Sequence, residues 1–264
     1  MWTAITREVS PALAQCELSF VDRSPIDIGR AQAQHDAYCR ALESLGCEVI
    51  RLPAQAALPD SVFVEDVALA FDEVAVATRP GAASRRGEGA AVLQVLASLR
   101  RLLRIEAPGT LDGGDVLRIG RRVFVGISAR SNAAGREQLR ELLAPFGYTV
   151  EDVATRGCLH LKSAVTQVGD DTVLVNPDWL VDAGAFAGYR CIEVDPAEEH
   201  AANAVRIGDA LLYPDGFPRT LQRLRAAGIA VTTVDVSELQ KAEGAVTCCS
   251  ILLRNDLPRG EGAA

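Results

Sequence analysis

Two adjacent cysteines, Cys248 and Cys249, lie in an apolar stretch near the end of the sequence. A cysteine attacks an electrophile as its thiolate, so it needs access to the substrate and a nearby base or positive charge. We expect a strand here, and because successive strand residues face opposite sides, only one thiol can face a given pocket. Position alone favours two buried core thiols, so any chemistry needs partners elsewhere in the chain.

His160 is the second candidate, in the segment Cys158-Leu-His-Leu-Lys-Ser at the expected start of a strand. A neutral imidazole is the usual general acid and base near pH 7. A lone histidine among leucines is more often a structural group with satisfied hydrogen bonds, and this alternative stays open. His35 and His200 have weaker claims, because they fall in expected helix and loop segments.

Acidic residues recur at the expected starts of two strands. The segment Leu111-Asp-Gly-Gly-Asp115 places two glycines between carboxylates, which needs special backbone angles or close approach, although an ordinary turn explains it too. In the second segment, Asp60 is followed by Glu65 and Asp66, which interrupt an otherwise apolar expected strand. A buried carboxylate is costly unless it is paired. Clustered acids that face a pocket would suit a cationic ligand.

Composition narrows the classes of partner and cofactor. The chain has 27 Lys and Arg against 35 Asp and Glu, a net charge of −8, which argues against nucleic acid. No stretch approaches the ~18 apolar residues of a membrane span, and no signal peptide is visible, so we expect a cytoplasmic protein. The seven cysteines form no CxxC pair and predict neither a disulfide framework nor a zinc site. Dinucleotide, phosphate, GxSxG and HExxH motifs are absent, so we expect no cofactor and no metal.

The elements that must position these residues recur along the chain. Each unit holds a β-branched hairpin, a Pro, Gly or Ser break, a helical stretch and often a short strand. One helix is expected over residues 92–103, and Ser131 is the expected N-cap of another. Four complete units begin near Val62, Asp115, His160 and Asn203.

The first strand, Ala4–Val9, and the last, Ala245–Leu253, each lack a hairpin partner. Their pairing would complete a fifth module, and 264 residues in five modules gives about 53 residues each. It would also close a ring and protect the open strand edges. Periodicity alone leaves an ordinary α/β sheet equally open. No Gly/Ser-rich linker divides the chain, so we expect residues 1–264 to form a single domain.

At these residues the sequence resembles the dimethylarginine dimethylaminohydrolase family of the guanidino-group-modifying (pentein) superfamily. The matching segments come in the family's order and span most of the chain: Leu58–Ala68, Thr78–Arg86, Leu111–Leu117, Phe124–Asn132, Leu159–Ser163 and Glu243–Ser250. The resemblance implies the family's fold class, an α/β protein forming a five-bladed pseudo-symmetric α/β propeller of repeated ββαβ modules. That fold agrees with the five modules counted along the chain.

The resemblance also implies roles for individual residues. Cys248 becomes the nucleophile, because the superfamily pattern is Cys-x-Ser, here Cys248-Cys249-Ser250. His160 becomes the acid and base, and Asp112 the catalytic carboxylate, which is Glu in some bacterial members. The implied substrate-binding residues are Leu18, Asp60, Glu65, Asp66, Arg85, Arg130 and Ala242.

Within that set, the two arginines would meet the amino-acid end of the substrate. Leu18 and Ala242 would make backbone or lid contacts. Animal relatives tend to carry Val at the position of Ala242, so this sequence departs from their pattern there.

The implied reaction converts dimethylarginine or monomethylarginine to citrulline and a methylated amine, through a covalent thiouronium on Cys248. Because a guanidinium is a poor electrophile, the site must hold it rigidly, and Asp66 and Asp112 can accept its N–H groups. The bound cation would also lower the thiol pKa. The same histidine would protonate the departing amine and then activate water.

Two other functional classes stay open for this sequence. Arginine or agmatine deiminases and amidinotransferases share the superfamily, although those chains are generally longer and agmatine lacks a carboxylate for Arg85 and Arg130. A non-catalytic propeller that binds other molecules has no reason to keep a cysteine, a histidine and an aspartate together. We expect a methylated arginine as small-molecule partner, no nucleic acid or membrane partner, and a monomer or homodimer. Zinc at the Cys248-Cys249 pair would act as an inhibitor rather than a cofactor.

Overall fold

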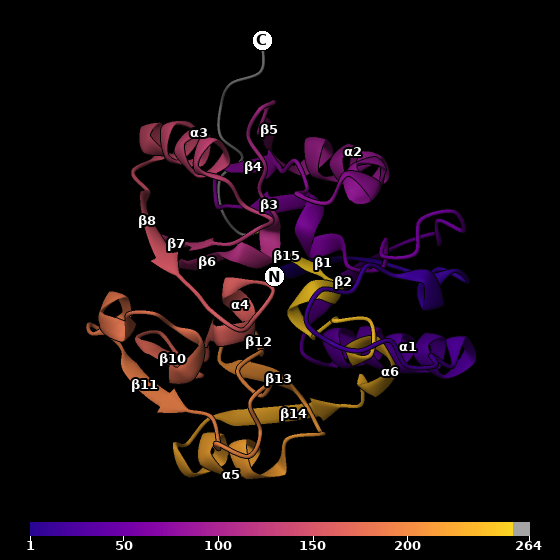
Figure 1. Cartoon of the computed structure of the whole chain (residues 1–264), viewed down its shortest axis with the longest axis vertical. Helices are drawn as coiled ribbons and strands as arrows, with labels where there is room; N and C mark the ends of the chain where they lie inside the picture. Colours follow the sequence, from indigo (N-terminus) through magenta and orange to yellow (C-terminus); the bar gives the residue numbers. More distant parts are fainter. Residues whose placement is uncertain (256–264) are drawn as a thin grey trace.

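The computed structural model describes residues 1–255, in which fifteen short strands pair into five three-stranded sheets. In each sheet an inner strand pairs antiparallel with a middle strand, which pairs parallel with an outer strand. A parallel pair needs a crossover, and helices or 3-10 turns supply it. Figure 1 shows the five sheets around one centre, with the longer helices outside them. The predicted five-bladed α/β propeller is confirmed, and residues 256–264 of the predicted domain lie outside the described part.

The inner strands are β15 (Ile251–Arg254), β3 (Ala68–Ala70), β6 (Val116–Ile119), β9 (Val165–Gln167) and β12 (Val205–Ile207). In the same blade order, the middle strands are β1 (Trp2–Arg7), β4 (Val74–Ala77), β7 (Arg122–Ile127), β10 (Thr172–Val175) and β13 (Ala210–Pro214). The outer strands are β2 (Cys47–Leu52), β5 (Arg101–Arg104), β8 (Thr149–Ala154), β11 (Arg190–Glu193) and β14 (Ala230–Val234).

Helices connect the middle and outer strands of four blades: α1 (Ile28–Ser44), α2 (Ala90–Leu99), α3 (Ala133–Leu143) and α5 (Pro218–Ala226). In the blade of β10, two 3-10 turns make this connection, η6 (Pro177–Trp179) and η7 (Ala183–Phe186). Two further short helices lie elsewhere, α4 (Leu161–Ala164) before β9 and α6 (Ser237–Gln240) after β14.

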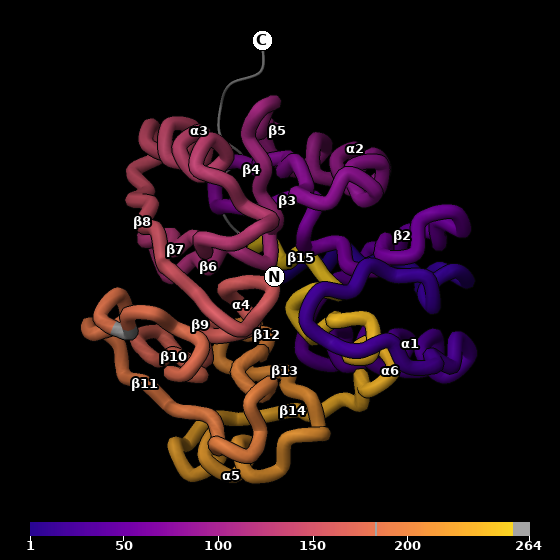
Figure 2. Tube along the Cα trace, in the orientation of Figure 1, coloured from indigo at the N-terminus to yellow at the C-terminus, as the bar shows by residue number. Residues whose placement is uncertain are grey.

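The two ends of the described chain close the ring. Strand β1 pairs antiparallel with β15, with Trp2 opposite Arg254 and Ile5 opposite Ile251, and pairs parallel with β2 on its other side. Figure 2 shows the yellow end of the chain next to the indigo start. The predicted pairing of the first and last strands is therefore confirmed, although the first strand begins two residues earlier than expected and the last is shorter than expected. Closure leaves the first blade with the same three-strand pattern as the others.

Helix α1 illustrates how local sequence shapes a blade. Asp27 caps it by accepting a hydrogen bond from the backbone N–H of Arg30 (3.0 Å), and Gly46 follows its end with φ 86°. Its buried residues recur every three or four positions, including Ala31, His35, Tyr38 and Leu42, so one face packs on the sheet. No helix within residues 1–255 combines the length and apolar character needed to cross a bilayer.

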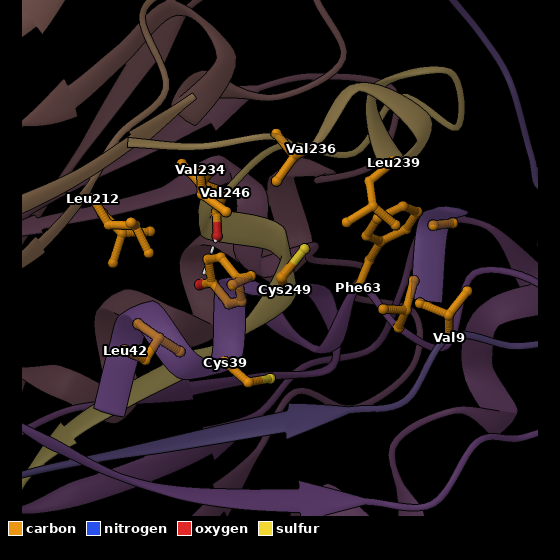
Figure 3. Packing of buried hydrophobic residues seen from close by; sticks show 14 of the residues in the cluster. Val9, Cys39, Leu42, Phe63, Leu212, Val234, Val236, Leu239, Val246 and Cys249 are labelled. Carbon is orange, nitrogen blue, oxygen red and sulfur yellow. Dashed lines mark hydrogen bonds between the residues drawn. The ribbon is translucent and has the colours of Figure 1, made fainter. Parts of the chain in front are cut away.

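The core cluster beneath α1 also receives the segment that contains the two adjacent cysteines. Figure 3 shows Cys249 among apolar side chains such as Phe63, Leu239 and Val246. The Tyr38 hydroxyl donates a hydrogen bond to the Val246 carbonyl (2.9 Å), which ties the helix to this segment. Cys249 is 0% exposed. It is a packing residue of this cluster.

Several expected strands are wrong in detail, for one shared reason. Glu65 and Asp66 lie on a 3-10 turn, η2 (Val64–Val67), and the adjacent cysteines lie on another, η8 (Thr247–Cys249). His160 precedes the short helix α4 rather than starting a strand. Such turns span too few residues to show a hydrophobic period, so they read as continuations of the strands that follow them.

Two helix boundaries also differ from expectation. Helix α2 ends at Leu99, and the residues after Arg100 form β5 beside β4, because strand pairing overrides the helical pattern. The N-cap of α3 is Asn132, whose side chain accepts from the N–H of Gly135. The Ser131 hydroxyl instead donates to Asp115 (2.6 Å), so it is used inside the molecule.

Candidate active site

A short turn comes directly before the inner strand of every blade, and each turn delivers a polar side chain toward the centre. These turns are η2 before β3, η4 (Gly113–Asp115) before β6, α4 before β9, residues 200–204 before β12, and η8 before β15. The residues in or next to them are Asp66, Asp112, His160, Asn203 and Cys248. The repeat therefore brings together side chains that are far apart in sequence.

A small cavity lies among these turns. Its lining comprises Glu17, Asp60, Phe63, Asp66, Arg85, Arg130, Leu159, His160, Ala242, Glu243 and Cys248. Seven of the predicted substrate-binding and catalytic positions thus line one cavity: two arginines, two aspartates, the histidine, Ala242 and the half-buried thiol. The free volume is about 20 Å³, room for about one water molecule.

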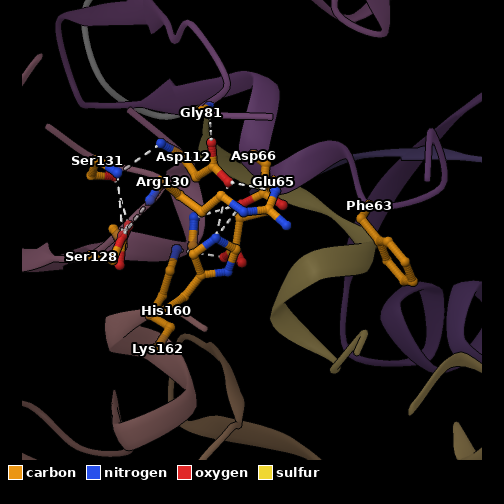
Figure 4. Close-up of polar contacts among 12 residues, drawn as sticks. Phe63, Glu65, Asp66, Gly81, Asp112, Ser128, Arg130, Ser131, His160 and Lys162 are labelled. Carbon is orange, nitrogen blue, oxygen red and sulfur yellow. Dashed lines mark hydrogen bonds and ion pairs between the residues drawn. The ribbon is translucent and has the colours of Figure 1, made fainter. Parts of the chain in front are cut away.

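The histidine is held between two aspartates (Figure 4). Its Nε2 lies 3.0 Å from Oδ2 of Asp112 and 3.9 Å from Oδ1 of Asp66. Burial alone would lower the pKa of His160, but the charge of Asp66 and the hydrogen bond with Asp112 raise this pKa to about 9. His160 therefore carries a proton at neutral pH, which it can donate.

The two glycines of the Asp-Gly-Gly-Asp segment permit this packing. A Cβ on Gly114 would lie 2.5 Å from Nδ1 of His160, and one on Gly113 would lie 1.9 Å from the Glu65 carbonyl oxygen. Both distances are too short for any side chain, so the expected close approach is the reason for the glycines. The N–H of Gly114 also donates to Asp66 (2.9 Å), which fixes that carboxylate beside the ring.

Asp66 and Arg85 form a buried ion pair. Nη1 of Arg85 donates to Oδ2 of Asp66 (2.6 Å), and its Nη2 donates to Glu88 (2.9 Å) and to the carbonyl of Phe63 (3.0 Å). Burial alone would raise the pKa of Asp66, but His160 and Arg85 hold it well below its usual range. Asp66 is therefore an anion, and most donors of Arg85 are already used within the protein.

Arg130 is the less committed arginine of the cavity. Its Nη1 lies 3.6 Å from Oδ2 of Asp112, and its Nη2 donates a long hydrogen bond to the hydroxyl of Ser19 (3.4 Å). Its backbone N–H donates to the hydroxyl of Ser128 (3.1 Å), which orients the loop. Figure 4 shows its side chain lying over the aspartates and the histidine. The guanidinium can change partners when an anionic ligand enters.

Cys248 and Cys249 diverge because the 3-10 turn directs them differently. Cys248 lines the cavity and is half-buried, whereas its neighbour lies in the core. Burial raises the pKa of the Cys248 thiol, and the charges of Glu65 and Asp66 raise it further. The thiol is therefore protonated until a positive charge arrives.

The remaining predicted positions lie at the margins. Asp60 accepts the N–H of Glu17 (3.2 Å), and Ala242 lines the cavity. Leu18 packs against the first core cluster and is outside the cavity lining. Glu65 is also outside that lining: it forms an ion pair with Lys162 and accepts the hydroxyl of Thr247 (2.9 Å).

Sequence reasoning missed two residues of the site. Asn203 accepts the N–H of Thr247 (3.1 Å) and donates to the carbonyl of Lys162 (3.0 Å), so it joins the cysteine turn to the histidine turn. A signal was available, because Asn203 lies two residues before its inner strand, as Asp66 does before β3. Glu243 lines the cavity and contacts residues 19–21, and no sequence pattern singled it out.

Asp66, Asp112 and His160 offer donor atoms within 4.8 Å of one another, a spacing that a metal ion would accept. Each of these atoms already has a partner in the protein, among them the N–H groups of Gly81 (2.8 Å) and Gly114. Hydrogen bonds within the protein therefore account for the closeness of these three side chains.

Comparison with known proteins agrees with this geometry. Residues 20–253 match the family model for N,N dimethylarginine dimethylhydrolase, eukaryotic. The chain belongs to the dimethylarginine dimethylaminohydrolase family. The family member of Streptomyces coelicolor is 41% identical over 253 residues, covering 95% of this chain and 96% of that protein.

Solved structures of the family superimpose closely. The enzyme of Pseudomonas aeruginosa, a cysteine-to-serine mutant complexed with citrulline, has a TM-score of 0.91 and 33% identity, covering 96% of this chain and all of that one. A second structure is the adduct of a histidine-to-glycine variant of dimethylarginine dimethylaminohydrolase with S-methyl-L-thiocitrulline. It has the same TM-score of 0.91, with 33% identity over 96% of this chain. Family members thus bind citrulline and a thiocitrulline in this fold.

Proposed function

We propose that this protein hydrolyses Nω-methylated arginines to citrulline and a methylated amine, with Cys248 as nucleophile. One observation supports this above the others: a half-buried thiol, a protonated histidine and a guanidinium-binding aspartate line one cavity, in a member of the dimethylarginine dimethylaminohydrolase family. The enzyme class is a hydrolase that acts on the C–N bond of a guanidino group.

Substrate binding would activate the nucleophile. Asp66 lines the cavity, where it can accept the N–H groups of a guanidinium, and Asp112, which is fully buried, holds His160. The bound cation would oppose the negative charge that raises the Cys248 pKa, so the thiolate forms when the substrate is present. A thiol that stays protonated in the empty site is also protected from oxidation, since oxidants react with the thiolate.

The chemical steps then follow from the positions of the thiol and the imidazole. The Cys248 thiol loses its proton to solvent, and the thiolate attacks the central guanidino carbon and forms a tetrahedral adduct. The protonated His160 gives its proton to the methylated nitrogen, the C–N bond breaks, and the amine leaves a thiouronium on the sulfur. Neutral His160 next takes a proton from water, which attacks the same carbon. Breakage of the C–S bond releases citrulline and restores the thiol.

The other end of the cavity selects an amino acid. Arg130 is the arginine whose donors are least committed, so we assign it the α-carboxylate, with Arg85 beside it and Asp60 near the α-ammonium. Leu18 and Ala242 would contribute backbone contacts, and Glu65 would support the turn that contains Cys248. We also propose that the chain acts as one domain in the cytoplasm, as a monomer or homodimer.

A substrate panel tests the function. We expect the purified protein to release citrulline from dimethylarginine and monomethylarginine, and much less from arginine or agmatine. Intact-mass spectrometry of a quenched reaction, followed by peptide mapping, should place the covalent adduct on Cys248. Faster turnover of arginine would favour a deiminase, and absence of any adduct or citrulline would favour a non-catalytic binding protein.

A further inference from the structure

A segment without helix or strand, residues 16–26, covers the cavity, and we refer to it as the lid. Glu17 of the lid lines the catalytic cavity, and Phe20 and Val21 line an adjacent cavity of about 290 Å³. Leu159 and Glu243 line both cavities, so they form part of the wall between them. The position of the lid therefore determines how the catalytic cavity is enclosed.

Glu243 holds the middle of the lid through one oxygen. Its Oε1 accepts the backbone N–H groups of three consecutive residues, Ser19 (2.8 Å), Phe20 and Val21 (2.8 Å). Consecutive N–H groups that converge on one point form a preferred binding site for an anion. Hydrogen bonds to a charged acceptor are roughly twice as strong as neutral ones. The carboxylate thus organises a stretch of chain that has no secondary structure of its own.

The backbone at Glu243 is strained into this position. Its φ of 57° is left-handed, and within residues 1–255 every other residue with positive φ is a glycine. Gly244 follows, and a Cβ there would lie 2.2 Å from the ring of Phe63, so the chain cannot shift in that direction. Four residues later comes Cys248. One rigid segment therefore places both the carboxylate that holds the lid and the thiol.

The lid must also open to let substrate enter the cavity. A free volume of about 20 Å³ does not admit an arginine, so entry requires the lid to leave and its three hydrogen bonds to Glu243 to break. The second oxygen of Glu243, Oε2, is buried without a hydrogen-bond partner. An unsatisfied buried oxygen reduces the stability of the closed state. The contact is consequently strong enough to close the lid and weak enough to release it.

We propose that Glu243 is a positioning residue that latches the lid over the bound substrate, an inference that rests on the proposed function for its catalytic consequence. The latch depends on the charge of the carboxylate. It acts through the lid and does not touch the reacting atoms.

The test compares Glu243→Gly and Glu243→Gln with the matched control Glu198→Gln. Glycine removes the carboxylate and relieves the left-handed backbone, so folding is expected to be kept, and glutamine preserves size without charge. Glu198 likewise accepts two consecutive backbone N–H groups, those of Arg219 (2.9 Å) and Thr220 (2.8 Å), but at the start of α5. The control removes the same kind of interaction outside the lid.

Two readouts report the lid directly. Trypsin cleavage after the exposed Arg23, mapped by mass spectrometry, measures lid opening, and iodoacetamide labelling of Cys248 measures access to the cavity. We expect both rates to rise about 10- to 100-fold in Glu243→Gly, by less in Glu243→Gln, and not at all in Glu198→Gln. Unchanged rates in both Glu243 variants would overturn the latch.

Kinetics separate the latch from the function. For dimethylarginine we expect KM to rise about tenfold in Glu243→Gly with kcat changed by less than about threefold, since the reacting groups are intact. Equal loss of kcat and of melting temperature would mean a structural role and would overturn the proposal. If the parent protein releases no citrulline, the proposed function fails, whereas the trypsin and iodoacetamide rates still decide the latch.

Discussion

The same five blades contribute to two regions of the ring that differ in chemistry. Along the inner strands, a cavity of about 220 Å³ is lined by residues of β3, β6, β9, β12 and β15, most of them small or aliphatic. In front of those strands, the five turns supply an aspartate to each of two blades, and a histidine, an asparagine and a cysteine to the other three. Glu65 and Lys162, which both line the cavity along the strands, form an ion pair.

This difference distinguishes the strand residues that hold the five blades together from the turn residues that carry the reactive groups. Strands must be alike for five sheets to pack around one centre, so their lining is repetitive and tolerant of change. The turns have no strand pairing to maintain, so each blade can contribute a different reactive group. Substitutions in the turns should therefore affect activity more than substitutions in the inner strands.

The largest effect should fall on one of two neighbouring residues. We predict that Cys248→Ser abolishes citrulline formation, because serine is a far weaker nucleophile and the adduct cannot form. Cys249→Ser should keep a substantial part of the activity while lowering the melting temperature, because that thiol is buried in the core. Citrulline assays and thermal melts of both variants measure this. Equal loss of activity in the two would reject Cys248 as the nucleophile.

We expect Arg130→Ala to have the second largest effect on activity. Loss of a partner for a buried charge typically costs ~3–5 kcal/mol, roughly two to four decades in kcat/KM for dimethylarginine if fully expressed. Agmatine has no carboxylate, so its already poor turnover should change little. Measuring kcat/KM for both substrates in both proteins checks the assignment. A common factor for the two substrates would make Arg130 structural.

His160 should make stability depend on pH. Its folded-state pKa of about 9 exceeds the unfolded value of 6.5, so the stabilisation is complete below pH 6.5 and is lost as pH rises through about 9. The difference is worth about 3 kcal/mol at most. Urea unfolding of the parent and His160→Asn at pH 6, 8 and 10 should show the stability gap shrinking. A gap that is constant with pH would place the histidine pKa near its ordinary value.

Asn203→Ala should reduce kcat by about tenfold, because loss of its hydrogen bonds to Thr247 and Lys162 frees the cysteine and histidine turns to move. Asn176→Ala is a matched control: Asn176 is equally buried and also bonds to backbone groups, but lies away from the cavity. Both variants should lose about 1–3 kcal/mol of stability. Comparable kcat values in the two would remove Asn203 from the site.

We expect the smallest effect on activity and stability from a substitution in the inner strands. Gln167 lines the larger cavity from β9 and bonds to carbonyls in its own hairpin, Gly169 (2.9 Å) and Asp170 (3.2 Å). We predict that Gln167→Ala changes stability by about 0.5 kcal/mol or less and kcat/KM by less than about twofold. Steady-state kinetics and melting curves suffice, and a large kinetic effect would show that this cavity serves catalysis.

Sequence alone predicted the five modules and the pairing of the ends, because hairpins and missing partners are visible in hydrophobic patterns. It failed at the turns: η2 and η8 were expected to be strands, since three or four residues show no period. The candidate site came mainly from the family resemblance, with Cys248, His160 and Asp112 matched by motif. Asn203 and Glu243 were not predicted, because their contacts, to Thr247 and to the lid, join segments far apart in the chain.

The pairing of β1 with β15 has a consequence for how the protein is made. Among the described elements, η8 and β15 are the last to be synthesised, so a growing chain holds the aspartates and the histidine long before it holds Cys248. The strand that completes the first blade follows that thiol by three residues. Nascent chains that are interrupted earlier have an open ring and no nucleophile. The strand that closes the ring and the nucleophile are therefore synthesised at nearly the same time, and an incomplete propeller cannot form a covalent adduct at that position.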